Sequence, residues 1–172
     1  MSSQTLFVYG TLLFPAIMRR VVGRVLPSEP AVLRGYRRRR VRNEVYPGVL
    51  PSLGSNVKGK LCRGLDGATL CLLDAFEGPE FERRRVQVMT AGGLRGAFVY
   101  VLTRTSRRFA TEDWVERDFA SLWERSAERD PDFAPSAHSK TNRVISDRDP
   151  SRRIGPHVPV PGETYIVDAP SR

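Results

Sequence analysis

The sequence predicts an α+β fold. Pattern analysis finds about six strand segments and three helical segments, and the strands do not alternate regularly with the helices, which argues against a doubly wound parallel sheet. The chain has 172 residues, of which 40% are hydrophobic and 27% charged. This length and composition are typical of one globular domain with a substantial core.

The N-terminal stretch combines a buried strand with a polar turn. Leu6 to Tyr9 is a short run of apolar residues, which is typical of a buried strand. Gly10 ends it, and a helix is predicted over 14–22, with Pro15 in the first turn, where proline is tolerated. The turn leaves backbone N–H groups without helical partners, and such groups suit a carboxylate or an oxyanion. The alternative is a turn that simply connects two core elements.

A linker is predicted at 27–30. Five further strands are predicted after it, at 31–33, 36–44, 57–63, 81–90 and 96–103. Gly35 is expected to end or bulge the first of them. Pro47–Gly48 fits the centre of a type II turn, because proline fixes φ and glycine accepts a positive φ. Residues 49–56 are predicted to be loop, and 91–93 to connect a hairpin.

The middle of the chain holds a helix that ends at Glu77. Asp66 is a candidate N-cap, because its carboxylate can accept hydrogen bonds from free N–H groups of the first turn. Leu70 and Leu73 fall on one face, and Leu72 and Phe76 (i and i+4) on another. Because both faces are largely apolar, we expect a well-buried helix. Gly78–Pro79 then stops it.

A third helix is predicted from Thr111, as its cap, to about Ala127, with Val115, Phe119 and Leu122 facing the core and Trp114 and Trp123 flanking them. Beyond it the composition changes to proline, serine and arginine. We therefore expect a domain at 1–129 and a tail at 130–172 that drapes over it or is partly disordered.

The net charge of +9 comes largely from arginine, most densely at Arg37–Arg40 and Arg83–Arg85. Alternate strand residues point to opposite faces, so each run splits its charge between two sides. We therefore do not expect nucleic acid to be a partner. Cys62 and Cys71 are expected to be reduced thiols. No metal-ligand spacing, apolar span or signal region is evident, which predicts no metal, no membrane association and a cytoplasmic location.

Three motifs together resemble the gamma-glutamylcyclotransferase-like family, in particular its AIG2-like and gamma-glutamylamine cyclotransferase branches. They are Tyr9-Gly10-Thr11-Leu12, Tyr46-Pro47-Gly48, and Leu72 to Arg83 around Glu77. The resemblance covers roughly residues 5 to 103 and implies a small mixed β-barrel flanked by helices. Where the family motif more often has tyrosine, this chain has Phe81.

The resemblance also implies that Glu77 is the catalytic acid and base. Free carbonyls at the helix end and the apolar neighbours Leu73 and Phe76 both disfavour a charged carboxylate, so its pKa should rise. A carboxyl group with a raised pKa can accept and return a proton near neutral pH. Glu80 and Glu82 are the rival carboxylates, but both are expected to be exposed.

The reaction implied is cofactor-free and intramolecular. The α-amine of a gamma-glutamyl amide or peptide attacks its own γ-carbonyl, and 5-oxoproline and an amine are released. Tyr9, Gly10, Thr11 and Leu12 would form the binding loop, Tyr46 would wall the cleft, and the hydroxyl of Tyr100 would point into it. Two alternatives stay open: a noncatalytic module whose basic surface binds an acidic partner or RNA, and a biosynthetic enzyme that removes a gamma-glutamyl protecting group.

Overall fold

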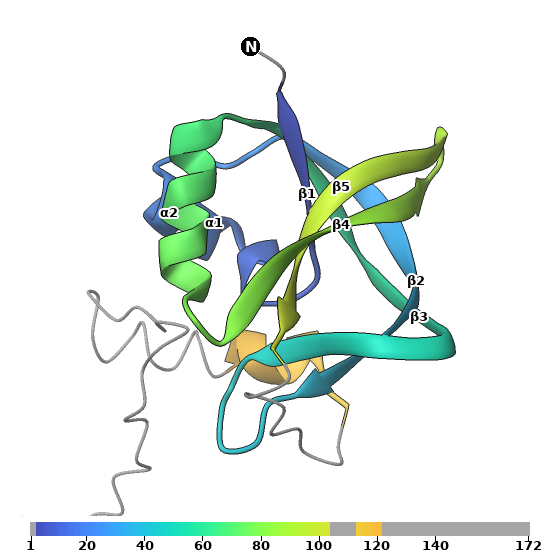
Figure 1. Ribbon diagram of the computed structural model, residues 1–172. Helices are drawn as coiled ribbons and strands as arrows, with labels where there is room; N and C mark the ends of the chain where they lie inside the picture. The colour runs from blue at the N-terminus through green and yellow to red at the C-terminus, as the bar shows by residue number, and fades with distance from the viewer. Residues whose placement is uncertain (1–2, 104–112, 122–172) are drawn as a thin grey trace, which may run out of the picture. The chain divides into compact units, whose positions relative to one another are not determined.

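A computed structural model describes residues 3–103 and 113–121. Five strands close into a barrel in the order β1-β3-β2-β4-β5 (Figure 1). Their bounds are β1 Gln4–Val8, β2 Ser28–Arg40, β3 Pro47–Leu65, β4 Phe81–Thr90 and β5 Gly93–Leu102. Neighbouring strands are antiparallel except β1 and β5, which pair in parallel at Leu6 and Phe98. The barrel is therefore mixed, and the predicted α+β class is confirmed. The predicted boundary at residue 129 lies outside the described residues.

Strands β2 and β3 are longer than the sequence predicted. Residues 28–34 of β2 pair with 62–56 of β3, and 36–40 pair with 51–47. The register shifts at Gly35, as expected for a bulge. The predicted linker at 27–30 and the predicted loop at 49–56 were wrong, because 28–30 belong to β2 and 49–56 to β3. Their serines, glycines and prolines have low strand propensity, but pairing with a neighbouring strand outweighs propensity.

The reversal between β2 and β3 precedes the predicted turn. Pro47 and Gly48 already pair with Arg40 and Arg39, and the φ of Gly48 is not positive, so the predicted type II turn is wrong. The chain reverses between Val41 and Tyr46 instead, where the Val41 N–H donates to the Tyr46 carbonyl at 3.1 Å. Asn43 takes the left-handed conformation there, with φ 64°.

Two helices pack beside each other at one side of the barrel (Figure 1). They are α1 (Pro15–Val22), which follows a short 3₁₀ turn η1 (Thr11–Leu13), and α2 (Gly67–Glu77). The predicted cap of α2 is confirmed, because Asp66 Oδ1 accepts from the Thr69 N–H at 2.8 Å. Leu70 and Leu73 are buried, but Leu72 is 50% exposed. The expectation that both faces of α2 are buried was therefore wrong.

In the segment 113–121, the aromatic side chains of Trp114 and Phe119 pack into the same apolar cluster as β1 and the helices. Residues 116–121 are helical, and Phe119 is buried as predicted. Val115 is 45% exposed, however, and Trp114 takes the core position instead. The Trp114 indole N–H donates to the Val45 carbonyl at 2.9 Å, which fixes this side chain beside the β2–β3 turn. The predicted cap Thr111, Leu122 and Trp123 lie outside the described residues.

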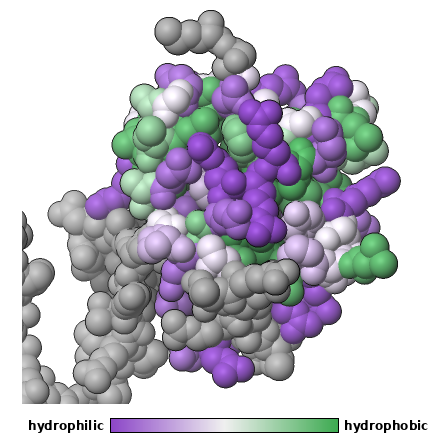
Figure 2. Space-filling model, viewed as in Figure 1, coloured by the Kyte–Doolittle hydropathy of each residue, from purple (hydrophilic) through white to green (hydrophobic). Residues whose placement is uncertain are grey.

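Strand β1 separates two apolar clusters and so positions the site. Phe7 and Tyr9 pack into one cluster, whereas Leu6 and Val8 pack into the other together with α1 and α2. This division follows from the alternation of side chains along a strand. Figure 2 shows polar side chains gathered over β4, where arginine is frequent. Among residues 3–103 and 113–121, no helix is long and apolar enough to cross a membrane.

Candidate functional site

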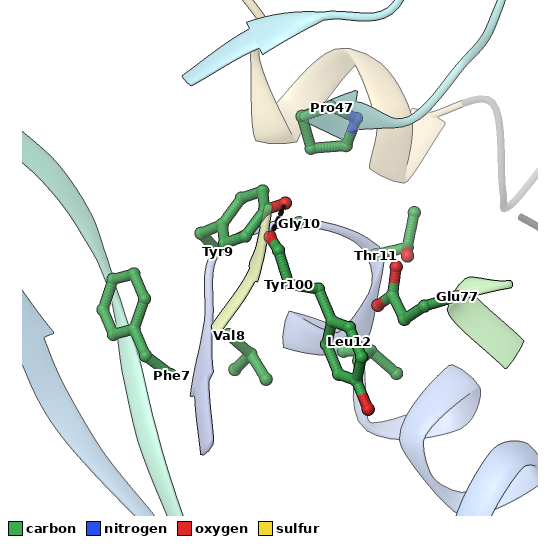
Figure 3. Close-up of a pocket in the computed structure, with 9 residues that line it drawn as sticks. All are labelled: Phe7, Val8, Tyr9, Gly10, Thr11, Leu12, Pro47, Glu77 and Tyr100. Carbon is green, nitrogen blue, oxygen red and sulfur yellow. Dashed lines mark hydrogen bonds between the residues drawn. The ribbon is translucent and has the colours of Figure 1, made fainter. Parts of the chain in front are cut away.

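A small cavity lies where β1 ends, between the barrel and the end of α2 (Figure 3). The cavity is partly open to solvent, and its volume is about 20 Å³, which is room for roughly one water molecule. The lining residues come from β1 and the turn after it, from the start of β3, from α2 and from β5: Phe7, Val8, Tyr9, Gly10, Thr11, Leu12, Pro47, Glu77 and Tyr100. The cavity thus brings Glu77 together with all four residues of the predicted binding loop.

The turn after β1 lines this cavity and carries backbone N–H groups that take no part in the bonds of η1. The first intrahelical bonds of η1 are those from Leu13 and Phe14, so the N–H groups of Gly10, Thr11 and Leu12 precede them. Within 3–103 and 113–121, no residue accepts a hydrogen bond from these three groups. Three consecutive free donors beside a cavity are suited to bind an anionic oxygen.

Glycine is required at position 10 by close packing. A Cβ built on Gly10 would lie 2.7 Å from Cγ of Pro47, closer than real Cβ contacts. The ring of Pro47 is rigid and belongs to β3, so it cannot easily move aside. Glycine therefore allows the turn to lie close to the start of β3, where Pro47 lines the cavity. The sequence had singled out its neighbour Tyr46 instead.

Glu77 is the last residue of α2, and Gly78 after it has φ 63°, a conformation that ends the helix. The half-buried side chain extends from this end toward the turn of Gly10 to Leu12 (Figure 3). Burial raises the pKa of the Glu77 carboxyl from 4.5 to about 8. In the described part of the chain, Glu77 has neither a hydrogen-bond donor nor a cation paired with its carboxyl group. Its proton is therefore available near neutral pH.

The two tyrosines of the cavity are tied to each other. The buried hydroxyl of Tyr9 donates to the carbonyl of Tyr100 at 2.7 Å, and burial raises the pKa of Tyr9. Tyr100 also lines the cavity (Figure 3). Its hydroxyl, however, donates to Asp74 Oδ1 at 2.7 Å. The expectation that this hydroxyl points into the cleft is contradicted, because Asp74, one helical turn before Glu77, draws it away.

Tyr46 is not among the residues that line this cavity. Its ring packs against Phe81, and its hydroxyl donates to Glu80 Oε2 at 3.0 Å. Burial, together with this bond to Glu80, raises the pKa of Tyr46. Glu80 is half-buried and not exposed as expected, but it serves as the partner of Tyr46.

Arg38 contacts the turn of the site from outside the cavity, and this contact was not predicted from the sequence. Its Nη1 donates to the carbonyl of Tyr9 at 2.7 Å, and its guanidinium lies 4.8 Å from the ring centroid of Trp114. Arg38 stands among four consecutive arginines, and no local pattern distinguishes it from the others. Alternation along a strand predicts two faces for this run but does not say which one meets the turn of β1.

A metal centre was not predicted, and the described residues contain no group of three or more histidine, cysteine, aspartate or glutamate side chains able to hold a metal ion. The lack of a cofactor likewise stays a prediction. The residues that line the site carry the carboxyl group of Glu77, the hydroxyl group of Thr11 and several apolar side chains.

A five-stranded mixed barrel with a carboxyl group beside a glycine turn defines a protein of the gamma-glutamylcyclotransferase-like fold. The family model described as gamma-glutamyl cyclotransferase, AIG2-like, matches residues 6–116. The chain belongs to this family, which includes gamma-glutamyl cyclotransferases. The family that the sequence motifs predicted is thereby confirmed.

Known relatives support the same assignment. The chain is 36% identical over 120 residues to AIG2-like protein C of Arabidopsis thaliana, which covers 69% of this chain and 63% of that protein. It thus spans less than two thirds of that relative's length. A protein of Arabidopsis thaliana solved in solution has a TM-score of 0.61 at 25% identity, covering 87% of this chain and 97% of that one. A solved gamma-glutamyl cyclotransferase has a TM-score of 0.52 at 18% identity, covering 59% and 68%, and shows the shared fold.

Proposed function

We propose that this protein is a gamma-glutamyl cyclotransferase that acts on a gamma-glutamyl amide or peptide without a cofactor and releases 5-oxoproline and an amine. The observation that carries the proposal is one cavity lined both by Glu77, whose pKa is raised to about 8, and by the turn of Gly10 to Leu12 with its free N–H groups. The reaction needs a group that takes and returns a proton, and donors that hold negative oxygen.

In the proposed mechanism, the Glu77 carboxylate first accepts a proton from the α-ammonium group of the substrate. The freed amine attacks the γ-carbonyl carbon and forms a carbon–nitrogen bond, so that the carbonyl oxygen becomes an oxyanion. When this intermediate collapses, the bond to the leaving amine breaks, and protonated Glu77 returns its proton to that nitrogen. The ring nitrogen, which still carries two hydrogens after the attack, releases one of them to water, and this leaves neutral 5-oxoproline lactam and the free amine. Tethering of the nucleophile corresponds to an effective molarity of ~10⁵ M or more, so no enzyme nucleophile is required.

The N–H groups of Gly10, Thr11 and Leu12 would bind the oxyanion or the substrate carboxylate. Fixed donors in a site that excludes water stabilise such charge strongly, because they need no reorganisation during the reaction. Tyr9 would anchor this loop to β5, because its hydroxyl donates a hydrogen bond to the Tyr100 carbonyl.

The test is a panel of gamma-glutamyl amides and dipeptides incubated with the full chain, with 5-oxoproline and the free amine both quantified. Stoichiometric release of the two products from at least one member supports the proposal. Absence of 5-oxoproline from every member at high enzyme concentration would refute it. The member that is turned over fastest identifies the class of leaving amine. This class helps to distinguish a role in general metabolism from the removal of a gamma-glutamyl protecting group in a biosynthetic pathway. A cytoplasmic location stays a prediction.

A further inference from the structure

The turn that follows β1 is held from outside the cavity by one cation. The half-buried Arg38 donates from Nη1 to the carbonyl oxygen of Tyr9 at 2.7 Å, a distance typical of a short, charge-assisted hydrogen bond. Arg38 itself does not line the cavity of Glu77. Its contact with the site is therefore indirect and passes through a peptide group.

That peptide group joins Tyr9 to Gly10. The carbonyl of Tyr9 and the N–H of Gly10 belong to the same planar unit, and the structure has no cis peptide bond among the described residues. In a trans peptide the N–H points opposite to the C=O. When Arg38 fixes the carbonyl on its own side, it directs the Gly10 hydrogen away from itself, and Gly10 lines the cavity.

A hydrogen bond accepted at the carbonyl also strengthens the donor at the other end of the peptide, because linked hydrogen bonds polarise one another. We propose that Arg38 is a positioning residue for catalysis, which orients and polarises the Tyr9–Gly10 peptide so that the Gly10 N–H binds the anionic oxygen of the substrate. The inference rests on the proposed function of the turn, and it adds a residue that acts without touching the substrate.

The contacts of Arg38 with neighbouring residues restrict the position of its guanidinium group. The guanidinium lies over the Trp114 ring at 4.8 Å from its centroid, and the Trp114 indole is itself bonded to the Val45 carbonyl. Burial lowers the pKa of Arg38, and the carboxylates of Glu116 and Asp113 oppose that shift. Arg37, the preceding residue in the chain, is exposed, and its Nη2 pairs with Asp113 Oδ1 at 3.3 Å.

The test compares Arg38→Gln with Arg37→Gln, which removes the same charge one residue away. We expect Arg38→Gln to lower kcat/KM for 5-oxoproline release about tenfold, which is less than the roughly 10²- to 10³-fold cost of deleting an oxyanion donor outright. Arg37→Gln should retain wild-type turnover. Arg38→Lys, which keeps the charge but not the planar guanidinium, should fall between them. Wild-type turnover by Arg38→Gln, or equal losses in both glutamine variants, would overturn the inference.

A second readout does not need turnover. In the ¹H–¹⁵N spectrum, Arg38→Gln should move the Gly10 amide proton upfield, because its peptide loses polarisation, while Arg37→Gln leaves it in place. Unchanged signals for residues of β4 and β5 show that the fold is intact. If the wild type releases no 5-oxoproline, the proposed function fails on its own. A Gly10 signal that stays in place in Arg38→Gln contradicts the polarisation of this peptide, whatever the activity.

Discussion

The hydroxyl of Tyr100 donates a 2.7 Å hydrogen bond to Asp74, the residue one helical turn before Glu77 on α2. The other carboxylate oxygen of Asp74 lies 3.5 Å from Nη2 of Arg83. Two carboxyl groups on one helix thus have opposite surroundings: Asp74 has a donor and a cation, whereas Glu77 has an apolar wall. This difference separates a structural carboxylate from the one proposed to move protons.

Tyr100→Phe removes that hydrogen bond while the ring stays in the cavity wall. Because the backbone carbonyl of Tyr100 still accepts from Tyr9, the turn should keep its support. We expect the free energy of unfolding to fall by about 1 kcal/mol, and kcat to stay within a few-fold of the wild type. Chemical denaturation and the 5-oxoproline assay measure the two effects. A large loss of kcat would place the hydroxyl in the reaction after all.

The ionisation of Glu77 should be visible as a pH dependence. Its pKa is raised from 4.5 to about 8 in the folded chain, so between these values the folded state binds a proton that the unfolded state has lost. The contribution of Glu77 to the free energy of unfolding therefore falls as pH rises from about 4.5 to about 8. A ¹³C titration of the side-chain carboxyl, assigned by its loss in Glu77→Gln, should give a midpoint near 8. A midpoint near 4.5 would contradict the burial of this group.

A pair of glycine substitutions separates the site from general stability. Gly10→Ala places a Cβ 2.7 Å from the ring of Pro47, so the turn must shift and the free N–H groups move with it. We expect a loss of kcat/KM of about 10²-fold, since donor geometry controls oxyanion stabilisation.

Gly67→Ala is the matched control, because a Cβ at this first residue of α2 meets nothing within 4 Å. Alanine favours helix over glycine, so the melting temperature should stay level or rise, with activity unchanged. Equal activity of Gly10→Ala and Gly67→Ala would show that the turn has no role in catalysis.

Local signals in the sequence predicted the parts of the fold that depend on neighbouring residues. The Asp66 cap, the end of α2 at Glu77 and Gly78, and the tight hairpin between β4 and β5 were all found this way. The inclusion of residues 49–56 in β3 could not be predicted, because it depends on pairing with β2 across many residues. Composition alone marks that segment as loop.

The sequence likewise predicted those parts of the site that local motifs mark, but not the contacts between distant segments. The turn at Gly10 and the glutamate at the end of α2 were marked by motifs, and the structure places both on one cavity. The direction of the Tyr100 hydroxyl was missed because Asp74 lies on a different element, and Arg38 was missed because its partner is a backbone carbonyl. Contacts of this kind carry no signature in either segment of sequence.

The proton transfer assigned to Glu77 is the central claim, and a comparison of two isosteric variants tests it most directly. Glu77→Gln and Glu80→Gln each replace a carboxyl group by an amide. In Glu80→Gln, the amide oxygen of the new side chain can still accept the hydrogen bond from the hydroxyl of Tyr46. With the best substrate of the panel, initial rates of 5-oxoproline release should fall by at least about 10²-fold in Glu77→Gln and stay near wild type in Glu80→Gln. Wild-type rates in Glu77→Gln would contradict the account.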